Sequence, residues 1–394
     1  MTYSTRHRNR VYLITGIRCV NQGVGGSRSM AQEIELSIMA STPEGIQPLL
    51  DKFEAEHRIH VRLRLMAWDT AWSALVKSAL YNDGPDVSEI GTTWIGDLAG
   101  MNALRPLDTN EVAAMGKSTA FFQSAWATAT QLGDWRVWSI PWLTGSRLIY
   151  YRPHLLEKAG IDPHTAFRSN EQIHHTISRL HASGVKIPWT VPTGETHTTL
   201  LNAASWVWAA GGDFIADNGK SVRFMEPAAL AGLKAYFMLG RYLAPGYRNL
   251  KGLEPDELFL SEPETAATAS GPWLFLRARE RLGDEAASKI SVALPPGASF
   301  VGGSNLAIWK YSRYPDAAVK LIRFLTQTPA QVYYTQQVGL LPAKVDALSA
   351  QPFCDEPLWQ LAFEGLKTGR TFPTIRLWGL IEERTSAALG AVWA

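Results

Sequence analysis

Expected strands and helices alternate through residues 33–90 of this chain. Residues 33–39, 61–65 and 86–90 have the apolar or alternating pattern of short strands. Between them, residues 46–53 and 72–80 place apolar side chains at the i, i+3, i+4 spacing of a helix. Such an alternation of strand and helix is typical of a parallel sheet covered by helices. The chain is therefore expected to belong to the α/β class.

Ligands of open α/β sheets collect beyond the carboxyl ends of the strands. Three loops of this chain reach that edge, and each carries a hydroxyl, a carboxylate or an indole. An acidic residue in the first turn of a helix has a purely structural alternative, because it also caps the helix or favours its dipole. The candidate ligand-binding residues in these loops are Glu44, Trp68, Asp69, Thr93 and Trp94.

A strand that stops, changes direction and resumes is predicted within residues 133–159. Pro141 interrupts the first part because it has no N–H to donate, and three small polar residues separate it from a second strand at 148–151. The pattern suits a hinge between two lobes, where small ligands usually bind, and it suits a buried β-hairpin with a wide loop equally well. The hinge interpretation makes candidate site residues of Trp142, Thr144 and Ser146.

A second crossing between lobes is expected in the strand 300–309, which a Gly-Gly-Ser sequence interrupts around Gly303. A polar loop at 192–198 adds two more candidates, Glu195 and His197. A histidine in such a loop is more often solvated than bound to a ligand. Helices are expected at 110–131, 172–181, 200–210, 227–239 and over most of 357–394, a hairpin at 214–224 and a strand at 187–191.

Composition excludes several classes of function. Lys and Arg number 38 and Asp and Glu 36, so the net charge of +2 gives no reason to expect a nucleic-acid partner. No apolar run reaches the length of a transmembrane helix. Cys19 and Cys354 provide neither a metal-binding spacing nor a disulfide framework. The sequence contains no HExxH, GxSxG, CxxC or phosphate-loop motif, so no metal, cofactor or catalytic nucleophile is expected.

Tryptophan is the unusual component, with 15 residues. Its wide flat face suits the apolar side of a sugar ring, although most of these indoles must fill the core. Carboxylates accept hydrogen bonds from hydroxyls, and a guanidinium donates a fixed fork of them. A sugar site is therefore a natural use for some of these residues.

The first 30 residues are ambiguous. Arg6, Arg8 and Arg10 precede a short apolar run at 11–17, as in a signal peptide, but Arg18 ends that run early. Either this leader is a degraded export signal or the true start lies elsewhere, for example at Met30.

Six segments follow one another as DGPDVSEIGTTWIGDLAGMNALRPL, IPWLTGSRLIYYRPHLLEKAGID, WVWAAGGDF, ATASGPWLF, FVGGSNLAIWKYSRYPDAAVKLIRFL and GLLPA. In this order they resemble the family 1 extracellular solute-binding proteins of carbohydrate ABC importers, the group that contains the maltose-binding protein. The resemblance covers roughly residues 33–394. It implies the type II periplasmic-binding-protein-like fold, in which each of two lobes is a sheet flanked by helices and crossing strands form the hinge.

The resemblance also implies boundaries and a site. The lobes are expected to comprise 31–141 with 306–345, and 146–301 with 349–394, around a hinge near 142–145 and 302–305. A carboxylate of the family's first crossing falls on Gly145 here, so the particular sugar does not carry over. The residues that match the family's sugar site are Thr93, Trp94, Thr144, Ser146, Trp273, Arg376 and Trp378.

The expected function is therefore that of a monomeric, non-enzymatic receptor. It is expected to bind a sugar or oligosaccharide between its lobes and deliver it to the membrane permease of an ABC importer, in the periplasm or outside the cell. The alternatives are a receptor of the same fold for a non-sugar solute, such as a phosphorylated polyol, and a glycoside hydrolase. A hydrolase needs two carboxylates flanking one bond, and no motif pairs Glu195 with Asp69 or Glu44.

Overall fold

The computed structural model describes residues 32–194 and 196–393, and it gives only the backbone of Thr196. The signal-like leader at 1–30 and the candidate Glu195 lie outside the described residues. Within the described part of the chain, no helix combines the length and the apolar composition needed to cross a membrane.

The first sheet has seven strands in the order β10-β5-β9-β3-β1-β2, with β4 paired to β9. Strand β1 is parallel to β2 and β3, whereas β9 runs antiparallel to β3 and β5. Helices α1 (Gln47–His57) and α2 (Trp68–Tyr81) connect the parallel strands, so the predicted alternation is confirmed. The strands are β1 (Gln32–Met39), β2 (Ile59–Met66), β3 (Val87–Gly91), β4 (Leu104–Arg105), β5 (Ile140–Ser146), β9 (Val301–Trp309) and β10 (Leu341–Pro342).

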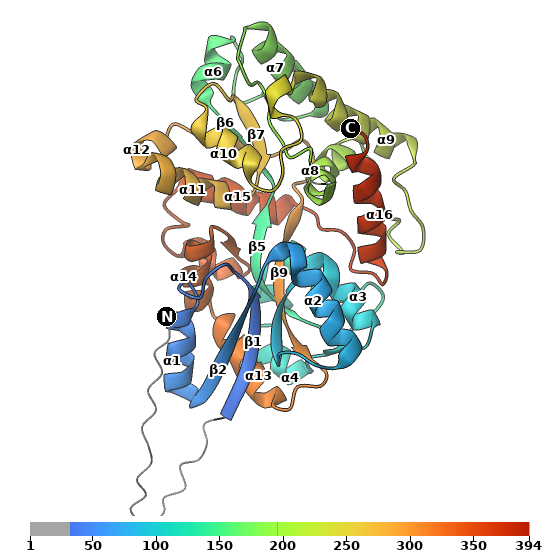
Figure 1. The fold of residues 1–394 in the computed structure, drawn as a ribbon, viewed down its shortest axis with the longest axis vertical. Coiled ribbons are helices and arrows are strands. Elements are labelled where there is room, and N and C mark those ends of the chain that lie inside the picture. The colour runs from blue at the N-terminus through green and yellow to red at the C-terminus, as the bar shows by residue number, and fades with distance from the viewer. Residues whose placement is uncertain (1–31, 195, 394) are drawn as a thin grey trace, which may run out of the picture. The chain divides into compact units, whose positions relative to one another are not determined.

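The second sheet has three strands in the order β7-β6-β8, which are β6 (Leu148–Tyr151), β7 (Ala267–Ser270) and β8 (Ser291–Ala293). The chain passes from β5 in the first sheet to β6 in the second over the single residue Arg147, and it returns through β9. Figure 1 shows β5 and β9 running side by side from one sheet toward the other. Strands β5 and β6 do not pair with each other, so the hairpin interpretation of this stretch is wrong.

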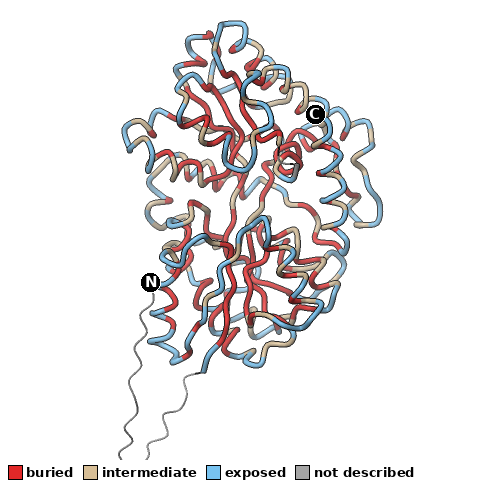
Figure 2. Tube along the Cα trace, viewed as in Figure 1, coloured by how far each residue is buried: buried red, intermediate tan, exposed pale blue. Residues whose placement is uncertain are grey.

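The fold is α/β with two lobes, each of which is a sheet flanked by helices. Most strand residues are buried, and Figure 2 shows buried residues along the strands of both sheets. The remaining helices, including one-turn 3-10 helices marked η, are η1 (Thr92–Trp94), α3 (Ile95–Gly100), α4 (Thr109–Ala114), η2 (Ser118–Ala120), α5 (Gln123–Trp126), α6 (Pro153–Lys158), α7 (Asn170–Ala182), α8 (Thr196–Ala209), α9 (Pro227–Met238), η3 (Leu239–Tyr242), η4 (Pro245–Tyr247), α10 (Glu254–Ser261), α11 (Trp273–Leu282), α12 (Asp284–Ala287), α13 (Pro315–Leu325), α14 (Thr328–Val338), η5 (Val345–Ser349), α15 (Pro357–Thr368) and α16 (Trp378–Gly390).

Some elements differ from the sequence predictions. The expected helix at 110–131 is three short helical pieces, because Gly116 and Lys117 adopt positive φ and turn the chain. Residues 187–191 make isolated bridges rather than a strand, and the expected hairpin at 214–224 has a single bridge between Ile215 and Val222. These segments have few ladder partners, so their local apolar pattern alone does not make them strands.

A buried carboxyl group joins three strands of the first sheet. Glu89 on β3 is 1% exposed and accepts hydrogen bonds from the Ser304 hydroxyl on β9 at 2.5 Å and from the Met39 N–H at 2.6 Å. Burial raises the pKa of Glu89 to about 7, against the smaller opposing effect of these two bonds. The folded protein therefore holds this carboxyl group protonated at pH values where the unfolded chain ionises it.

The free energy of unfolding is expected to fall as the pH rises from about 4.5 to about 7. In this range the folded state binds more protons than the unfolded state, and Glu89 alone contributes a loss on the order of 3 kcal/mol. The variant Glu89→Gln should lack this slope. Urea denaturation of both proteins at pH 5 and pH 7.5 measures the difference, and equal pH slopes would show that Glu89 ionises normally in the fold.

Candidate functional site

Three indoles gather where β2 and β3 end. The centroid of the Trp94 ring lies 5.8 Å from that of Trp68 and 5.6 Å from that of Trp72, and the rings are tilted rather than parallel. Trp68 and Trp72 are one turn apart on α2, and Trp94 ends the 3-10 helix that follows β3. Trp68 is half exposed, and the other two are partly buried. We call Trp68, Trp72 and Trp94 the indole trio.

Polar candidates occur at the ends of the same strands. Thr93 is partly buried beside Trp94, and Asp69 is exposed in the first turn of α2. Glu44 is exposed in the loop after β1, and the Thr42 side chain lowers the pKa of its carboxyl group. The sequence thus places all three loops at one edge of the sheet, as expected from the parallel order of β1, β2 and β3.

A carboxylate beside the indole trio holds the start of α16. Asp97 on α3 accepts hydrogen bonds from the N–H of Leu377 at 2.9 Å and of Gly379 at 2.7 Å. A Cβ atom at Gly379 would lie 3.6 Å from the Trp72 ring, so α16 begins directly against the trio. Burial raises the pKa of Asp97 and the nearby Glu382 raises it further, whereas the two backbone bonds lower it. Helices from distant parts of the sequence therefore meet at this point.

His197 and Glu382 extend this polar cluster to α8. The imidazole Nε2 lies 3.0 Å from the Glu382 Oε1, and Glu382 is 4% exposed, while the histidine side chain stays largely accessible. The sequence analysis selected His197 and missed its partner 185 residues away. Together with Asp97, these groups give the trio a neighbouring set of hydrogen-bonding side chains.

Trp273 lies in a different setting from the indole trio. Its Nε1 donates to the Asp256 Oδ2 at 2.9 Å, and the same oxygen accepts from the Ser270 hydroxyl at 3.0 Å. The Arg147 guanidinium lies 5.2 Å from the Trp273 ring centroid. Burial raises the pKa of Asp256, which is 4% exposed. The indole is therefore held in a fixed orientation, with part of its surface accessible.

Two other predicted indoles belong to the core. Trp142 is fully buried and stacks on Tyr334, with ring centroids 4.8 Å apart. Trp378 is 1% exposed and stacks on Phe372 at 4.6 Å. Neither ring presents a face to solvent, so neither is available to stack on a ligand in this structure. A position at the crossing or in the family motif does not show whether an indole faces a ligand or the core.

Three predicted residues at the crossing have structural roles. The Thr144 hydroxyl donates to the Gly302 carbonyl oxygen at 3.1 Å, and the Ser146 hydroxyl donates to the Ala362 carbonyl oxygen at 3.0 Å. Gly303 adopts φ +138°, and a Cβ atom there would lie 2.7 Å from the Thr144 Cα atom. Both hydroxyls are buried, so these residues fix the two crossing strands instead of offering groups to a ligand.

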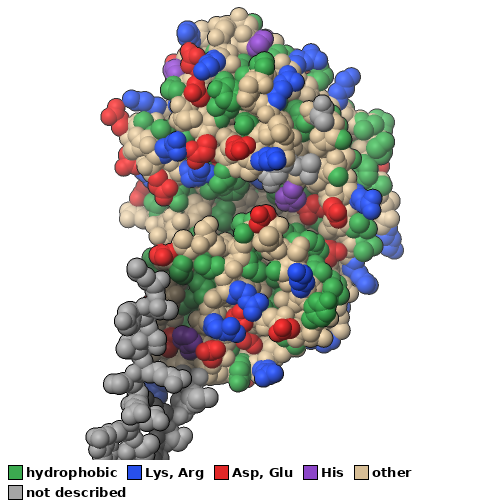
Figure 3. All heavy atoms as spheres, in the orientation of Figure 1, with side chains coloured by type: hydrophobic (Ala, Val, Ile, Leu, Met, Phe, Trp, Pro, Cys, Tyr) green, Lys and Arg blue, Asp and Glu red, His purple; other side chains and the backbone are tan. Residues whose placement is uncertain are grey.

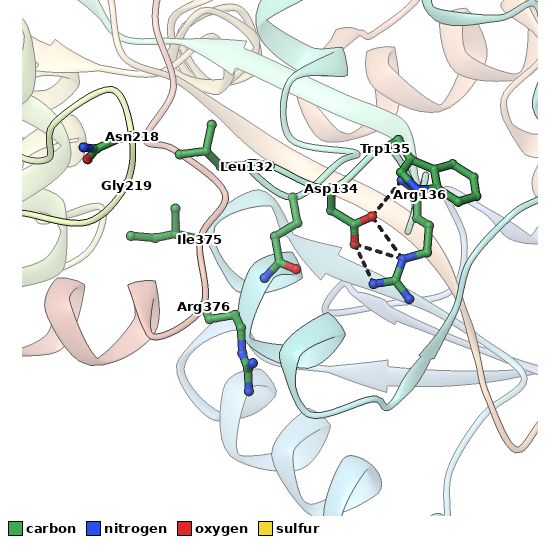
Figure 4. Close-up of a pocket in the computed structure, with 10 residues that line it drawn as sticks. Leu132, Asp134, Trp135, Arg136, Asn218, Gly219, Ile375 and Arg376 are labelled. Atoms are coloured by element: carbon green, nitrogen blue, oxygen red, sulfur yellow. Dashed lines mark hydrogen bonds and ion pairs between the residues drawn. The ribbon is translucent and has the colours of Figure 1, made fainter.

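Arg376 lines a separate cavity of about 680 Å³, shown in Figure 4. The cavity is bounded by the loop 131–136, by Asn218 and Gly219 between α8 and α9, and by Ile375 and Arg376 before α16. The other predicted site residues do not line it. The Arg376 guanidinium is exposed and makes a long contact of 3.5 Å with the Gly100 carbonyl oxygen.

Sequence reasoning missed Trp72, Asp97, Asp256 and Glu382. The spacing of Trp68 and Trp72, one helical turn apart, was a usable signal for the first of these. The three carboxylates have no local signature, because their partners are remote in the sequence. Among residues 32–194 and 196–393 no cluster of His, Cys, Asp and Glu has the arrangement of a metal site.

Removing the Asp97 carboxylate should destabilise the protein. Asp97→Ala leaves the N–H groups of Leu377 and Gly379 without their acceptor, which is expected to cost about 1–2 kcal/mol. Asp97→Asn retains one acceptor oxygen and should cost less. Urea denaturation at pH 7 checks both variants, and an Asp97→Ala protein as stable as the wild type would refute the role assigned to this contact.

Figure 3 shows the face on which the two sheets meet. Positive and negative side chains are interspersed over it, and hydrophobic side chains lie in a hollow between the part that carries β6 and β7 and the part that carries β1 and β2. A surface of this kind offers no continuous basic patch for a polyanion. It suits a small, mainly neutral ligand bound in a recess.

Comparison with known proteins gives the chain a family context. Residues 49–359 match the family model described as bacterial extracellular solute-binding protein. A probable ABC transporter-binding protein of Deinococcus radiodurans is 28% identical over 230 residues, which cover 55% of this chain and 54% of that protein. The match thus spans about half the length of this relative. A putative binding protein of Brucella abortus is 23% identical, covering 93% of this chain and 90% of the relative.

Solved structures share the fold at low sequence identity. The GacH receptor of Streptomyces glaucescens, studied unliganded and with acarbose, superposes with a TM-score of 0.79 at 19% identity, covering 92% of this chain and 93% of that one. The sugar-binding protein MalE of Xanthomonas citri also has a TM-score of 0.79, at 22% identity and 92% coverage of both chains. At these identities the similarity establishes the arrangement of the chain and not the ligand.

Proposed function

Because the chain belongs to the bacterial extracellular solute-binding protein family, we propose that it is the substrate-binding component of an ABC importer for a sugar or oligosaccharide. The family resemblance and the two-lobe fold predicted from the sequence are confirmed. Members of this family are binding proteins, and we propose that this chain likewise carries out no reaction on its ligand.

The observation that carries the proposal is the indole trio together with polar side chains on α3, α8 and α16. Trp68 and Trp94 offer flat apolar surfaces at the loops after β2 and β3. Asp97 accepts a hydrogen bond from the Gly379 N–H of α16 beside Trp72, and Glu382 of the same helix pairs with His197. A sugar ring needs an apolar surface against its C–H face and planar polar groups around its hydroxyls, and this arrangement supplies both.

Lobe closure is the proposed mechanism of capture. The lobes would comprise 31–141 with 306–345, and 146–301 with 349–394, and they would rotate about the crossings near 142–145 and 302–305. A ligand that contacts both lobes binds the closed state better, so it shifts the open–closed equilibrium toward closure. The closed surface would then be recognised by the permease outside the cytoplasmic membrane, with the receptor acting as a monomer.

Solved structures of the same fold contain two classes of ligand, and these classes provide the solutes to test. Structures of this fold include proteins in complex with maltose and with maltotetraose, and one in complex with glycerophosphocholine. The half-exposed Trp68, the partly buried Trp94 and a net charge of +2 favour the saccharides for this chain. The phosphodiester represents the non-sugar alternative.

A thermal-shift screen tests the proposal. The panel contains maltose, maltotetraose, tagatose, diacetylchitobiose and glycerophosphocholine at the same concentration. A ligand present at 100 times its Kd should stabilise the protein by about 2.7 kcal/mol and raise its Tm. A rise with a saccharide supports the proposal. A rise with glycerophosphocholine alone would replace the sugar by a non-sugar solute.

A further inference from the structure

Helix α16 takes its N-terminal cap from a distant part of the chain. Leu377, directly before the helix, adopts φ +68°, which a leucine rarely occupies, and its side chain has no group that could cap the helix. The acceptor is instead the Asp97 carboxylate on α3, 2.9 Å from the Leu377 nitrogen and 2.7 Å from the Gly379 nitrogen. A cap normally comes from the residue next to the helix, so this carboxylate does the work of a local residue from 280 positions away.

The rest of α16 is fixed among residues assigned to the second lobe. Glu382 pairs with His197 on α8 at 3.0 Å, and Trp378 stacks on Phe372 with ring centroids 4.6 Å apart. Phe372 packs in turn on Phe300 at 5.0 Å. Figure 1 shows α16 between α8 and α3. The helix is therefore expected to move with the second lobe, whereas α3, which caps it, belongs to the first.

The segment that leads into α16 also touches the first lobe. The Ile375 backbone lies so close to Gly96 on α3 that a Cβ atom added at Gly96 would collide with the Ile375 carbonyl oxygen. Glycine is needed at this position because only it allows two backbones to approach so closely. In the loop that precedes β5, the Leu132 N–H donates to the Thr374 carbonyl oxygen at 2.8 Å. The cap at Asp97 is thus part of a wider contact between the lobes.

Opening of the cleft would break this contact in one step. Rotation about the crossings near 142–145 and 302–305 would draw α3 away from α16, so both hydrogen bonds of the Asp97 carboxylate would be lost together. Charge-assisted hydrogen bonds to a carboxylate are stronger than neutral ones, and the helix dipole favours a negative charge at this end of α16. The open conformation would leave the first N–H groups of α16 with water as their only acceptor.

We propose that Asp97 is a latch that holds the two lobes closed by capping α16 from across the lobe boundary. The proposal rests on the lobe boundaries of the proposed function and not on the identity of the ligand. The latch stabilises the closed conformation whether or not a ligand is bound, and a ligand adds its own contacts. Because Gly379 lies beside Trp72, the latched helix stands against the indole trio. Affinity then depends on the fraction of receptor that the latch keeps closed.

Distance measurements between the lobes test the latch. The full chain carries Cys19→Ser and Cys354→Ser, with nitroxide labels at Lys52→Cys on α1 and Gln172→Cys on α7, both at exposed positions. Double electron–electron resonance then gives the distribution of distances between the two labels. In Asp97→Ala, the ratio of closed to open receptor is expected to fall about five- to tenfold without added ligand, as for the loss of one helix cap.

Asp108→Ala is the matched control. Asp108 caps α4 within the first lobe, where its carboxylate accepts hydrogen bonds from the N–H groups of Asn110 at 2.8 Å and Glu111 at 2.9 Å. Its removal takes away a cap of the same kind without touching the second lobe. The distance distribution of Asp108→Ala should therefore remain that of the wild type, although the variant loses stability in urea.

Gly96→Ala tests the contact between the lobes without removing the carboxylate. The added methyl group would meet the Ile375 carbonyl oxygen, so it should push the segment before α16 away from α3. The closed distance should then lose population in this variant as well. Asp97→Asn retains one acceptor oxygen, and its distribution should lie between those of the wild type and Asp97→Ala.

The outcomes separate the latch from the proposed function. Wild-type distance distributions in both Asp97→Ala and Gly96→Ala would overturn the latch, because the contact would then serve folding alone. A change of equal size in Asp108→Ala would overturn it too, since the loss of any cap would then open the receptor. A gain of the open distance confined to the first two variants supports the latch. The absence of a thermal shift with every saccharide of the panel would contradict the proposed function and leave this result standing.

Discussion

Replacing Trp94 with alanine is expected to weaken saccharide binding about 30-fold. Trp94 is the central ring of the indole trio, in contact with both Trp68 and Trp72, so its loss removes the shared surface on which a sugar ring would stack. Truncation of a central aromatic residue in a binding site typically costs about 2 kcal/mol, and each 1.4 kcal/mol corresponds to a factor of ten. Titration calorimetry with the most stabilising saccharide of the panel measures the change.

A matched control separates binding from folding. Trp94 is partly buried, so Trp94→Ala also loses stability, by about 1–2 kcal/mol. Trp126 is partly buried as well and packs against Phe121 at 5.5 Å, away from the trio. Trp126→Ala should lose similar stability and keep its affinity. If the two variants bound the saccharide equally well, the indole trio would not be the site.

Replacing Gly303 with alanine is expected to produce the largest loss of stability, about 3–4 kcal/mol. Gly303 combines φ +138° with close approach to the backbone of β5, where an added Cβ atom would meet the Leu143 carbonyl oxygen and lie 2.7 Å from the Thr144 Cα atom. The penalty for this backbone conformation adds to the displacement of the paired strand. Urea denaturation monitored by circular dichroism gives the difference.

Gly211→Ala is the control for Gly303→Ala. Gly211 has φ +76°, and an added Cβ atom would meet nothing within 4 Å. Gly211→Ala should therefore lower the free energy of unfolding by only about 1 kcal/mol, because only the backbone conformation opposes the side chain. A Gly303→Ala protein no less stable than Gly211→Ala would contradict the close approach of β5 and β9 at the crossing.

Much of the fold was predictable because its signals are local. The alternation of strands and helices in residues 33–90 and the apolar stripe of α13 both follow from side-chain periodicity. The local sequence could not distinguish a hinge from a hairpin at Pro141. The difference depends on whether β5 pairs with β6 or with β9, which lies far along the chain. The resemblance to a family supplied that long-range information.

The site was less predictable than the fold. Periodicity does not distinguish an indole that faces a ligand from one that faces the core, so Trp142 and Trp378 were selected together with Trp68 and Trp94. The partners of His197 and Asp97 lie far along the chain on α16. Contacts of this kind arise from packing between helices and leave no pattern in a single sequence.

Titration calorimetry of the wild-type protein with maltose, maltotetraose and diacetylchitobiose tests the central claim most directly. The account predicts that at least one of them binds with a Kd near or below about 1 μM, equivalent to −8.2 kcal/mol, and that the saccharide is recovered chemically unchanged. It also predicts a negative heat-capacity change, because binding buries the indole surfaces. Absence of binding heat for all three, or recovery of shortened saccharides, would contradict a receptor that holds a sugar without reacting with it.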